Sequence, residues 1–109
     1  MLFLVTLTYI RLVEEVHAHL STHRDWLDKY ATNGQILVAG PLQSGDGGLL
    51  LAHCEDRSEL DALLEKDPFH IQQLVKYDIQ AMTPALRAWD FPMAWAREAR
   101  VAARSPLDI

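Results

Sequence analysis

Two residues of this chain are of types that can move a proton near neutral pH. His23 interrupts an otherwise apolar helical stripe, four residues before Leu27, and Asp67 stands in the only Asp-Pro-Phe step of the chain. An imidazole and a carboxylate are the usual groups for general acid–base chemistry. Because the chain has few other reactive groups, His23 and Asp67 are the first candidates for a catalytic pair.

Both residues also have a structural interpretation. An inward-facing His23 could be a core histidine whose ring is satisfied by a backbone carbonyl. Asp67 precedes Pro68, and proline suits the first position of a helix, so the Asp67 carboxylate is well placed as an N-cap. Capping a helix and orienting a histidine are compatible, because a carboxylate has two oxygens. From the residues alone, both interpretations stay open.

The other reactive residues carry weaker signals. His19 precedes His23 by four residues, a spacing that could grip a metal ion, but no third ligand is placed to complete the set. The glycine-rich segment 44–48 lacks the spacing of a phosphate-binding loop and reads as a hairpin loop that could border a pocket. Ser44 has no base next to it in sequence, and Cys54 is expected to be buried in a strand, so neither is a convincing nucleophile. We therefore expect no metal and no cofactor.

Composition restricts the class of protein. A chain of 109 residues with half of them apolar predicts one globular domain. The formal net charge of −5 argues against nucleic-acid binding, which normally needs a basic surface. The single cysteine excludes an internal disulfide. The apolar start has no basic leader or cleavage site, and no apolar run is long enough to cross a bilayer. We expect a soluble cytoplasmic protein without a membrane partner.

The elements that must position these residues follow from hydrophobic periodicity and turn signals. The first expected helix ends at Gly34. Ser21 and Thr22 could break it into two parts, with Thr22 as the N-cap of the second part. Strands are predicted at 2–10, 35–39, 49–54 and 75–82, and helices at 12–33, from Asp56 or Ser58 to 65, and briefly at 68–74. The order is the split βαβ arrangement of a ferredoxin-like α+β fold, with a four-stranded antiparallel sheet and helices on one face.

Both faces of this sheet are expected to be apolar. In the first strand Phe3 and Val5 point one way while Leu2 and Leu4 point the other, so something must cover the second face. One covering is a second copy of the chain in a symmetric homodimer. The other is the chain's own tail, with Trp89, Phe91 and Trp95 ahead of a helix-prone run at 94–103. We favour the homodimer, with 84–109 as a helical extension packed on its rim.

The order of these features resembles the YciI-like (YCII-related) domain family. The resemblance covers residues 1–83 and leaves the tail outside. It rests on the β-rich start and on a set of short motifs in fixed order: His23 followed by Asn33-Gly34, then Ala39-Gly40-Pro41, Gly47-Gly48, Ser58-Glu59-Leu60 and Lys66-Asp67-Pro68-Phe69.

The resemblance implies a dimeric α+β barrel, in which two ferredoxin-like sheets pack together. It also implies an active site made of a histidine on the first helix and an aspartate before proline, which fall on His23 and Asp67. A related branch contains chloromuconolactone dehalogenases, which suggests acid–base chemistry on small organic acids or lactones.

Three hypotheses about function follow. The first is a lyase-, isomerase- or hydrolase-like enzyme in which Asp67 orients His23, with Tyr9, Ser44 and Phe69 as walls of a small-molecule pocket that the tail could occlude or reshape. The second is a non-catalytic small-molecule-binding or dimerisation module, because a conventional nucleophile and a cofactor motif are lacking. The third is haem or metal binding through His19 or His23.

Overall fold

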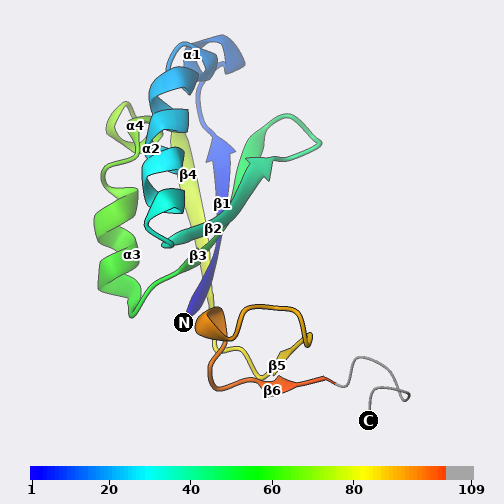
Figure 1. Cartoon of the computed structure of the whole chain (residues 1–109). Coiled ribbons are helices and arrows are strands. Elements are labelled where there is room, and N and C mark those ends of the chain that lie inside the picture. The colour runs from blue at the N-terminus through cyan, green and yellow to red at the C-terminus, as the bar shows by residue number, and fades with distance from the viewer. Residues whose placement is uncertain (103–109) are drawn as a thin grey trace.

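A four-stranded antiparallel sheet forms the centre of the molecule in the computed structural model, which describes residues 1–102 (Figure 1). Its strands are β1 (Leu2–Tyr9), β2 (Ile36–Pro41), β3 (Gly47–His53) and β4 (Val75–Met82), in the order β2-β3-β1-β4. The central strands β1 and β3 pair with each other, β4 pairs with β1, and β2 pairs with β3, all antiparallel. The predicted ferredoxin-like α+β fold is confirmed.

Four helices lie on one face of this sheet (Figure 1). They are α1 (Val13–His17), α2 (Leu20–Thr32), α3 (Arg57–Leu64) and α4 (Pro68–Ile71). None of the helices within residues 1–102 has the length and apolar character that crossing a bilayer requires.

The core lies between the helices and one face of the sheet. Alternation along β1 places Phe3, Val5 and Leu7 inside it, because successive side chains of a strand point to opposite faces. The helices contribute apolar side chains at three- and four-residue spacing, which share one helical face. These are Trp26 and Tyr30 of α2 and Leu60, Leu63 and Leu64 of α3.

The helix ends follow the sequence signals except at one break. Asp56 caps α3 by accepting the Glu59 amide at 2.9 Å, and Gly34 leaves α2 with a φ of +84°. The break between α1 and α2 falls before Leu20, so the predicted position at Ser21 and Thr22 is wrong. Thr22 caps nothing, because its hydroxyl donates to the carbonyl of His19 at 3.0 Å.

The face of the sheet away from the helices carries exposed apolar side chains. Leu4 is 39% exposed and pairs with Leu51 of β3, which in turn pairs with Val38 of β2. A register shift in β2 separates Ile36, which is buried, from Val38, which is 62% exposed. We call Leu4, Val38, Leu49 and Leu51 the open face.

Residues 84–102 form an extension rather than the predicted helix. It contains a short parallel pair, β5 (Leu86–Arg87) and β6 (Arg100–Val101), and the 3₁₀ turn η1 (Met93–Trp95). The amide of Arg100 donates to the carbonyl of Ala85 at 3.0 Å, so this backbone pairs across the extension instead of within a helix. Such pairing overrides helix propensity, which is a weak preference. Residues 103–109 of the predicted helical extension lie outside the described part.

The extension lies at the end of the sheet where the chain begins (Figure 1). The opposite end holds α1 and the turn between β2 and β3 (Figure 1). The cavity described in the next subsection lies at that opposite end, and no residue of 84–102 lines it.

Candidate active site

The structure brings His23 and Asp67 into direct contact although 44 residues separate them. His23 lies in α2 and Asp67 caps α4, and the distance from Nδ1 of His23 to Oδ1 of Asp67 is 2.7 Å. The side chain of Asp67 is completely buried, and His23 is only 8% exposed. Asp67 is also the N-cap of α4, because Oδ1 accepts the Phe69 amide at 3.0 Å, so one side chain both caps a helix and contacts His23.

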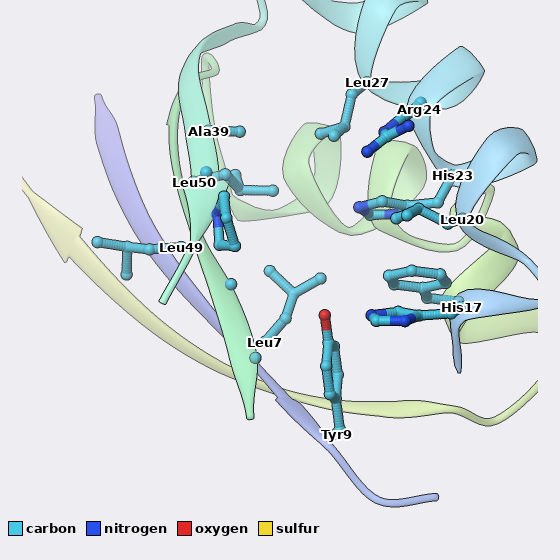
Figure 2. Close-up of a pocket in the computed structure, with 15 residues that line it drawn as sticks. Leu7, Tyr9, His17, Leu20, His23, Arg24, Leu27, Ala39, Leu49 and Leu50 are labelled. Carbon is cyan, nitrogen blue, oxygen red and sulfur yellow. The ribbon is translucent and has the colours of Figure 1, made fainter. Parts of the chain in front are cut away.

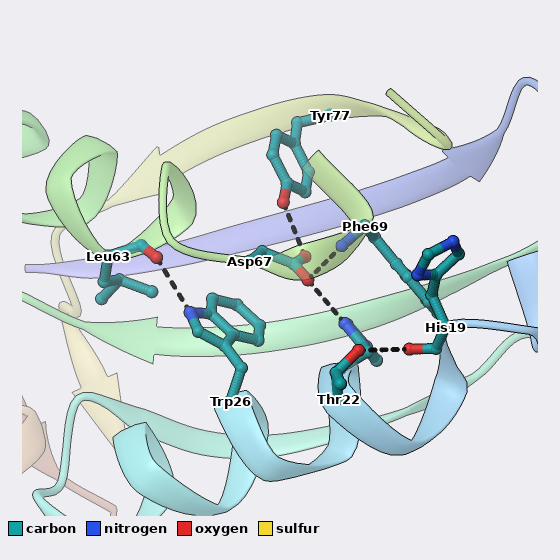
Figure 3. Close-up of polar contacts among 8 residues, drawn as sticks. His19, Thr22, Trp26, Leu63, Asp67, Phe69 and Tyr77 are labelled. Atoms are coloured by element: carbon teal, nitrogen blue, oxygen red, sulfur yellow. Dashed lines mark hydrogen bonds and ion pairs between the residues drawn. The ribbon is translucent and has the colours of Figure 1, made fainter. Parts of the chain in front are cut away.

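The buried carboxylate of Asp67 has donors on both oxygens. Oδ1 accepts from the Phe69 amide and faces Nδ1 of His23, while Oδ2 accepts from the Tyr77 hydroxyl at 2.7 Å (Figure 3). A backbone amide can only donate, and an ionised carboxylate only accepts. The Phe69 amide and the Tyr77 hydroxyl therefore donate to the carboxylate, Nδ1 of His23 lies within hydrogen-bond distance of it, and both of its buried oxygens have partners.

Tyr77 is a member of this network that the sequence interpretation missed. Burial raises the pKa of the Tyr77 phenol, and the negative charge of Asp67 and their hydrogen bond raise it further. The phenol therefore keeps its proton and serves Asp67 as a donor. The available signal was its inward position on β4 beside Val75 and Ile79, because a buried tyrosine hydroxyl usually finds a partner.

The ring of His23 is held in one orientation by aromatic neighbours. It stacks on Phe69 with centroids 3.8 Å apart and planes 2° apart, and on Trp26 at 5.6 Å. Trp26 is itself anchored, because its indole nitrogen donates to the carbonyl of Leu63 at 3.0 Å (Figure 3).

The contact with Asp67 favours one tautomer of the neutral imidazole. An ionised Asp67 must receive the Nδ1 proton, so the neutral His23 ring keeps its lone pair on Nε2. The described residues offer Nε2 no hydrogen-bond partner. This nitrogen is therefore the one free to exchange a proton with a bound molecule.

A cavity of about 460 Å³ lies against His23, bounded by the sheet, α2 and the start of α4 (Figure 2). Tyr9 and Phe69, two of the predicted pocket walls, both line it, and the Tyr9 hydroxyl points into the space (Figure 2). Most of the other lining residues are apolar or glycine: Leu7, Leu20, Leu27, Ala39, Gly40, Pro41, Gly47, Gly48, Leu49 and Leu50. A largely apolar hollow with a few polar groups is the usual form of a small-molecule site.

Ser44, the third predicted wall, does not line this cavity. It is exposed in the β2–β3 turn, and its hydroxyl bonds the carboxylate of Asp46. The same hairpin reaches the cavity instead through Gly47 and Gly48. A Cβ at Gly47 would lie 1.9 Å from the Leu7 carbonyl oxygen, so only glycine permits the approach of the hairpin to β1.

Two further polar residues of the lining were not predicted: His17 and Arg24. They alternate with Leu20 and Leu27 at three- and four-residue spacing, so all four face the cavity from α1 and α2. That spacing was the signal available in the sequence.

Other chemistry has less support in the described part of the chain. No three histidine, cysteine, aspartate or glutamate side chains within residues 1–102 are grouped to hold a metal ion. Cys54 is a buried free thiol, and burial raises its pKa to about 11, so it is protonated at neutral pH and poorly suited as a nucleophile.

Comparison with known proteins agrees with this architecture. A model of the YCII-related domain matches residues 1–83. Among solved structures, the chain is similar to 5-chloro-2-hydroxyhydroquinone dehydrochlorinase of Burkholderia phenoliruptrix in complex with 2,5-dihydroxybenzoquinone. The TM-score is 0.68 at 20% sequence identity, over 78% of this chain and 96% of that one, which shows a shared fold. A comparison with curated proteins found no match.

Proposed function

This chain belongs to the YCII-related domain family, and on that premise we propose that it is an acid–base enzyme in which His23 transfers a proton. The observation that carries the proposal is the 2.7 Å contact between Nδ1 of His23 and Oδ1 of Asp67, with the other ring nitrogen left for the cavity. Asp67 acts as the residue that orients the imidazole and compensates its charge.

The proposed step uses the neutral imidazole as a base. Nε2 takes a proton from a C–H or O–H group of the substrate, and the resulting imidazolium is stabilised by the ionised Asp67 beside Nδ1. The proton then returns to a carbon or to a leaving group. General acid–base help of this kind contributes about 10²–10⁴-fold to a rate.

The cavity supports a substrate of modest size. We propose a small organic acid or lactone, because about 460 Å³ lies within the range of small-molecule pockets. The similar solved protein is named as a dehydrochlorinase, and loss of hydrogen chloride requires removal of a proton. The proton-transfer role of His23 would serve such a reaction.

The experiment is a turnover screen with chlorinated and unchlorinated hydroxyquinones and lactones. The variants are His23→Ala and Asp67→Asn, with His53→Ala as the control because His53 lies outside this cavity. We expect kcat to fall by about 10²–10⁴-fold in His23→Ala and to stay near wild type in the control. A decrease of only a few-fold in folded His23→Ala would overturn the mechanism.

An independent measurement tests the orienting role of Asp67. Nitrogen NMR of the imidazole distinguishes which ring nitrogen carries the proton. We expect the Nδ1–H tautomer of His23 in the wild type and a mixture of tautomers in Asp67→Asn, because the amide side chain no longer requires a proton from Nδ1. An unchanged tautomer in Asp67→Asn would remove Asp67 from the mechanism.

The alternative function is a non-catalytic binding module. It is favoured by the absence, among the described lining residues, of a serine or cysteine that could form a covalent intermediate. Ligand-dependent increases in melting temperature that persist in His23→Ala, with no turnover in either protein, would support it.

We also propose that the protein is a homodimer joined through the open face. Leu4 is 39% exposed, Leu49 37% and Val38 62%, and burial of such side chains contributes about 1.5–3 kcal/mol each. Leu51 of β3 pairs with both Leu4 of β1 and Val38 of β2, so the apolar area is contiguous across three strands, which is unusual for a monomer. A symmetric partner would bury the same residues from both sides.

Sedimentation tests this assembly. We expect Val38→Glu to be a monomer and Leu12→Glu to remain a dimer, because Leu12 is equally apolar and 68% exposed but lies before α1, away from the sheet. A monomeric wild-type protein would contradict the proposal.

A further inference from the structure

Apart from the Tyr9 hydroxyl, the polar side chains around the cavity are cationic or protonatable, and within residues 1–102 no carboxylate lines it. His17, His23 and Arg24 line the space, whereas the lining contains neither aspartate nor glutamate. Asp67 is fully buried behind His23 and is not among the lining residues. A molecule in the cavity therefore meets local positive charge in a chain whose formal net charge is −5.

Arg24 has no role elsewhere in the described structure. The ion pairs within residues 1–102 are His23–Asp67 and Arg57–Asp61, and neither includes Arg24. Asp28 lies one turn further along α2 but does not pair with it. Figure 2 shows the guanidinium directed to the cavity beside His23, between Leu20 and Leu27. Arg24 itself is exposed, and the apolar walls of the cavity keep part of the water away from an anion beside it, which reduces the screening of that contact.

We propose that Arg24 binds the anionic group of the ligand, a carboxylate or a ring enolate, and so selects a charged organic acid over a neutral lactone. The inference rests on the proposed function, since it assigns the substrate class of the same site. The guanidinium suits these groups because it presents donors in a planar fork that matches a carboxylate. With the anion at Arg24, the ligand lies in the space that also faces Nε2 of His23, and the Tyr9 hydroxyl is available on the opposite wall (Figure 2).

A pair of probes that differ in charge tests this specificity. Benzoate and benzamide have the same ring and nearly the same shape, but only benzoate is an anion at neutral pH. Their binding is measured by calorimetry, and NMR shifts of the Leu20 and Leu27 methyl groups locate it. We expect the wild type to prefer benzoate by on the order of tenfold, or about 1.4 kcal/mol, because a hydrogen bond to a charged group is stronger than one to a neutral group.

The variants separate charge from shape. Arg24→Gln should lose the preference for benzoate while binding benzamide as before, and Arg24→Lys should keep part of it. Arg57→Gln is the matched control, because Arg57 is exposed on α3 and pairs with Asp61 away from the cavity. It should behave as the wild type. Arg24 is exposed, and circular dichroism checks that each variant is folded.

Several results would overturn the inference. These are failure of benzoate to bind, equal affinity for the two probes, an unchanged preference in Arg24→Gln, or an equal loss in Arg57→Gln. Failure of the proposed function has a different signature, because binding is measured without turnover. A selective, Arg24-dependent benzoate site together with full activity in His23→Ala would keep the anion site and reject the acid–base mechanism.

Discussion

At the cavity end of the sheet, the completely buried Asp67 receives donors on both oxygens, from α2, α4 and β4. In the extension beyond the other end, Arg87 donates through Nη1 to the carbonyl of Phe91 at 2.8 Å, while its Nε is buried without a partner. Each region holds a charged side chain, but only the first connects segments far apart in sequence. The comparison indicates that the polar network at the cavity organises the fold, whereas the contacts of Arg87 serve a local turn.

The largest expected effect comes from removing the carboxylate at the cavity end. Asp67→Ala leaves His23 Nδ1, the Phe69 amide and the Tyr77 hydroxyl without their acceptor. We expect the free energy of unfolding to fall by about 3–5 kcal/mol, as for other broken buried pairs. Urea denaturation measures it, and a loss below about 1 kcal/mol would mean that the network does not organise this end.

Substitution of Gly47, at the same end of the sheet, should lower the free energy of unfolding somewhat less than Asp67→Ala does. In Gly47→Ala the new methyl group would meet the Leu7 carbonyl 1.9 Å away, so the hairpin must move. We expect a loss of about 1–3 kcal/mol, typical of overpacking. Gly40→Ala is the control, because a Cβ there meets no atom within 4 Å. Equal melting temperatures for the two variants would contradict the steric argument.

Tyr77→Phe removes one donor to Asp67 and should lower the free energy of unfolding by about 1 kcal/mol near neutral pH. The substitution should also change how stability depends on pH in the alkaline range. The folded-state pKa of Tyr77 is raised, first by burial and then by Asp67, so the unfolded chain loses this proton first as pH rises. The stability that Tyr77 contributes is therefore complete below its ordinary value of about 10 and declines above it.

Denaturation at about pH 8 and about pH 10.5 checks this sign, since the two values bracket the ordinary tyrosine pKa. We expect the wild type to lose more stability between them than Tyr77→Phe. Tyr30→Phe serves as the control, because Tyr30 lies in the core but makes no contact with Asp67. A steeper loss in Tyr77→Phe than in the wild type would reverse the linkage and refute the explanation.

The smallest effect is expected in the extension. Arg87→Met loses the bonds to the carbonyls of Trp89 and Phe91 but also removes the buried Nε that has no partner, so the changes offset each other. We expect a change within about 1 kcal/mol by the same denaturation measurement. A loss of unfolding free energy as large as that of Asp67→Ala would show that Arg87 stabilises the fold as much as Asp67 does, which would contradict the comparison.

Local signals were enough to predict most of the fold. The alternation in β1, the caps at Asp56 and Asp67, and the left-handed Gly34 each act within a few residues of chain. Within the helix-prone run at 94–103, Arg100 and Val101 pair with β5 instead of continuing a helix, and no local signal predicts that pairing. The break before Leu20 was misplaced for a related reason, since Thr22 can bond backward as well as cap.

The candidate site was predicted in part. The histidine and the aspartate before proline stand out by residue type and position, and Tyr9 and Phe69 line the cavity. Tyr77 and Arg24 were missed because their importance depends on what lies opposite them. For Tyr77 that is a carboxylate ten residues earlier, and for Arg24 it is a hollow bounded by strands distant in sequence.

Asp67 both caps α4 and contacts the His23 ring, and this has a practical consequence for selection experiments. One oxygen of this side chain starts α4 and also holds the imidazole, so a library sorted only for heat resistance should retain aspartate at position 67 without any demand for turnover. Persistence of the residue in such a library is therefore no measure of enzymatic fitness. Arg24 and Tyr9, whose side chains face the hollow, are the positions at which the two kinds of selection should diverge.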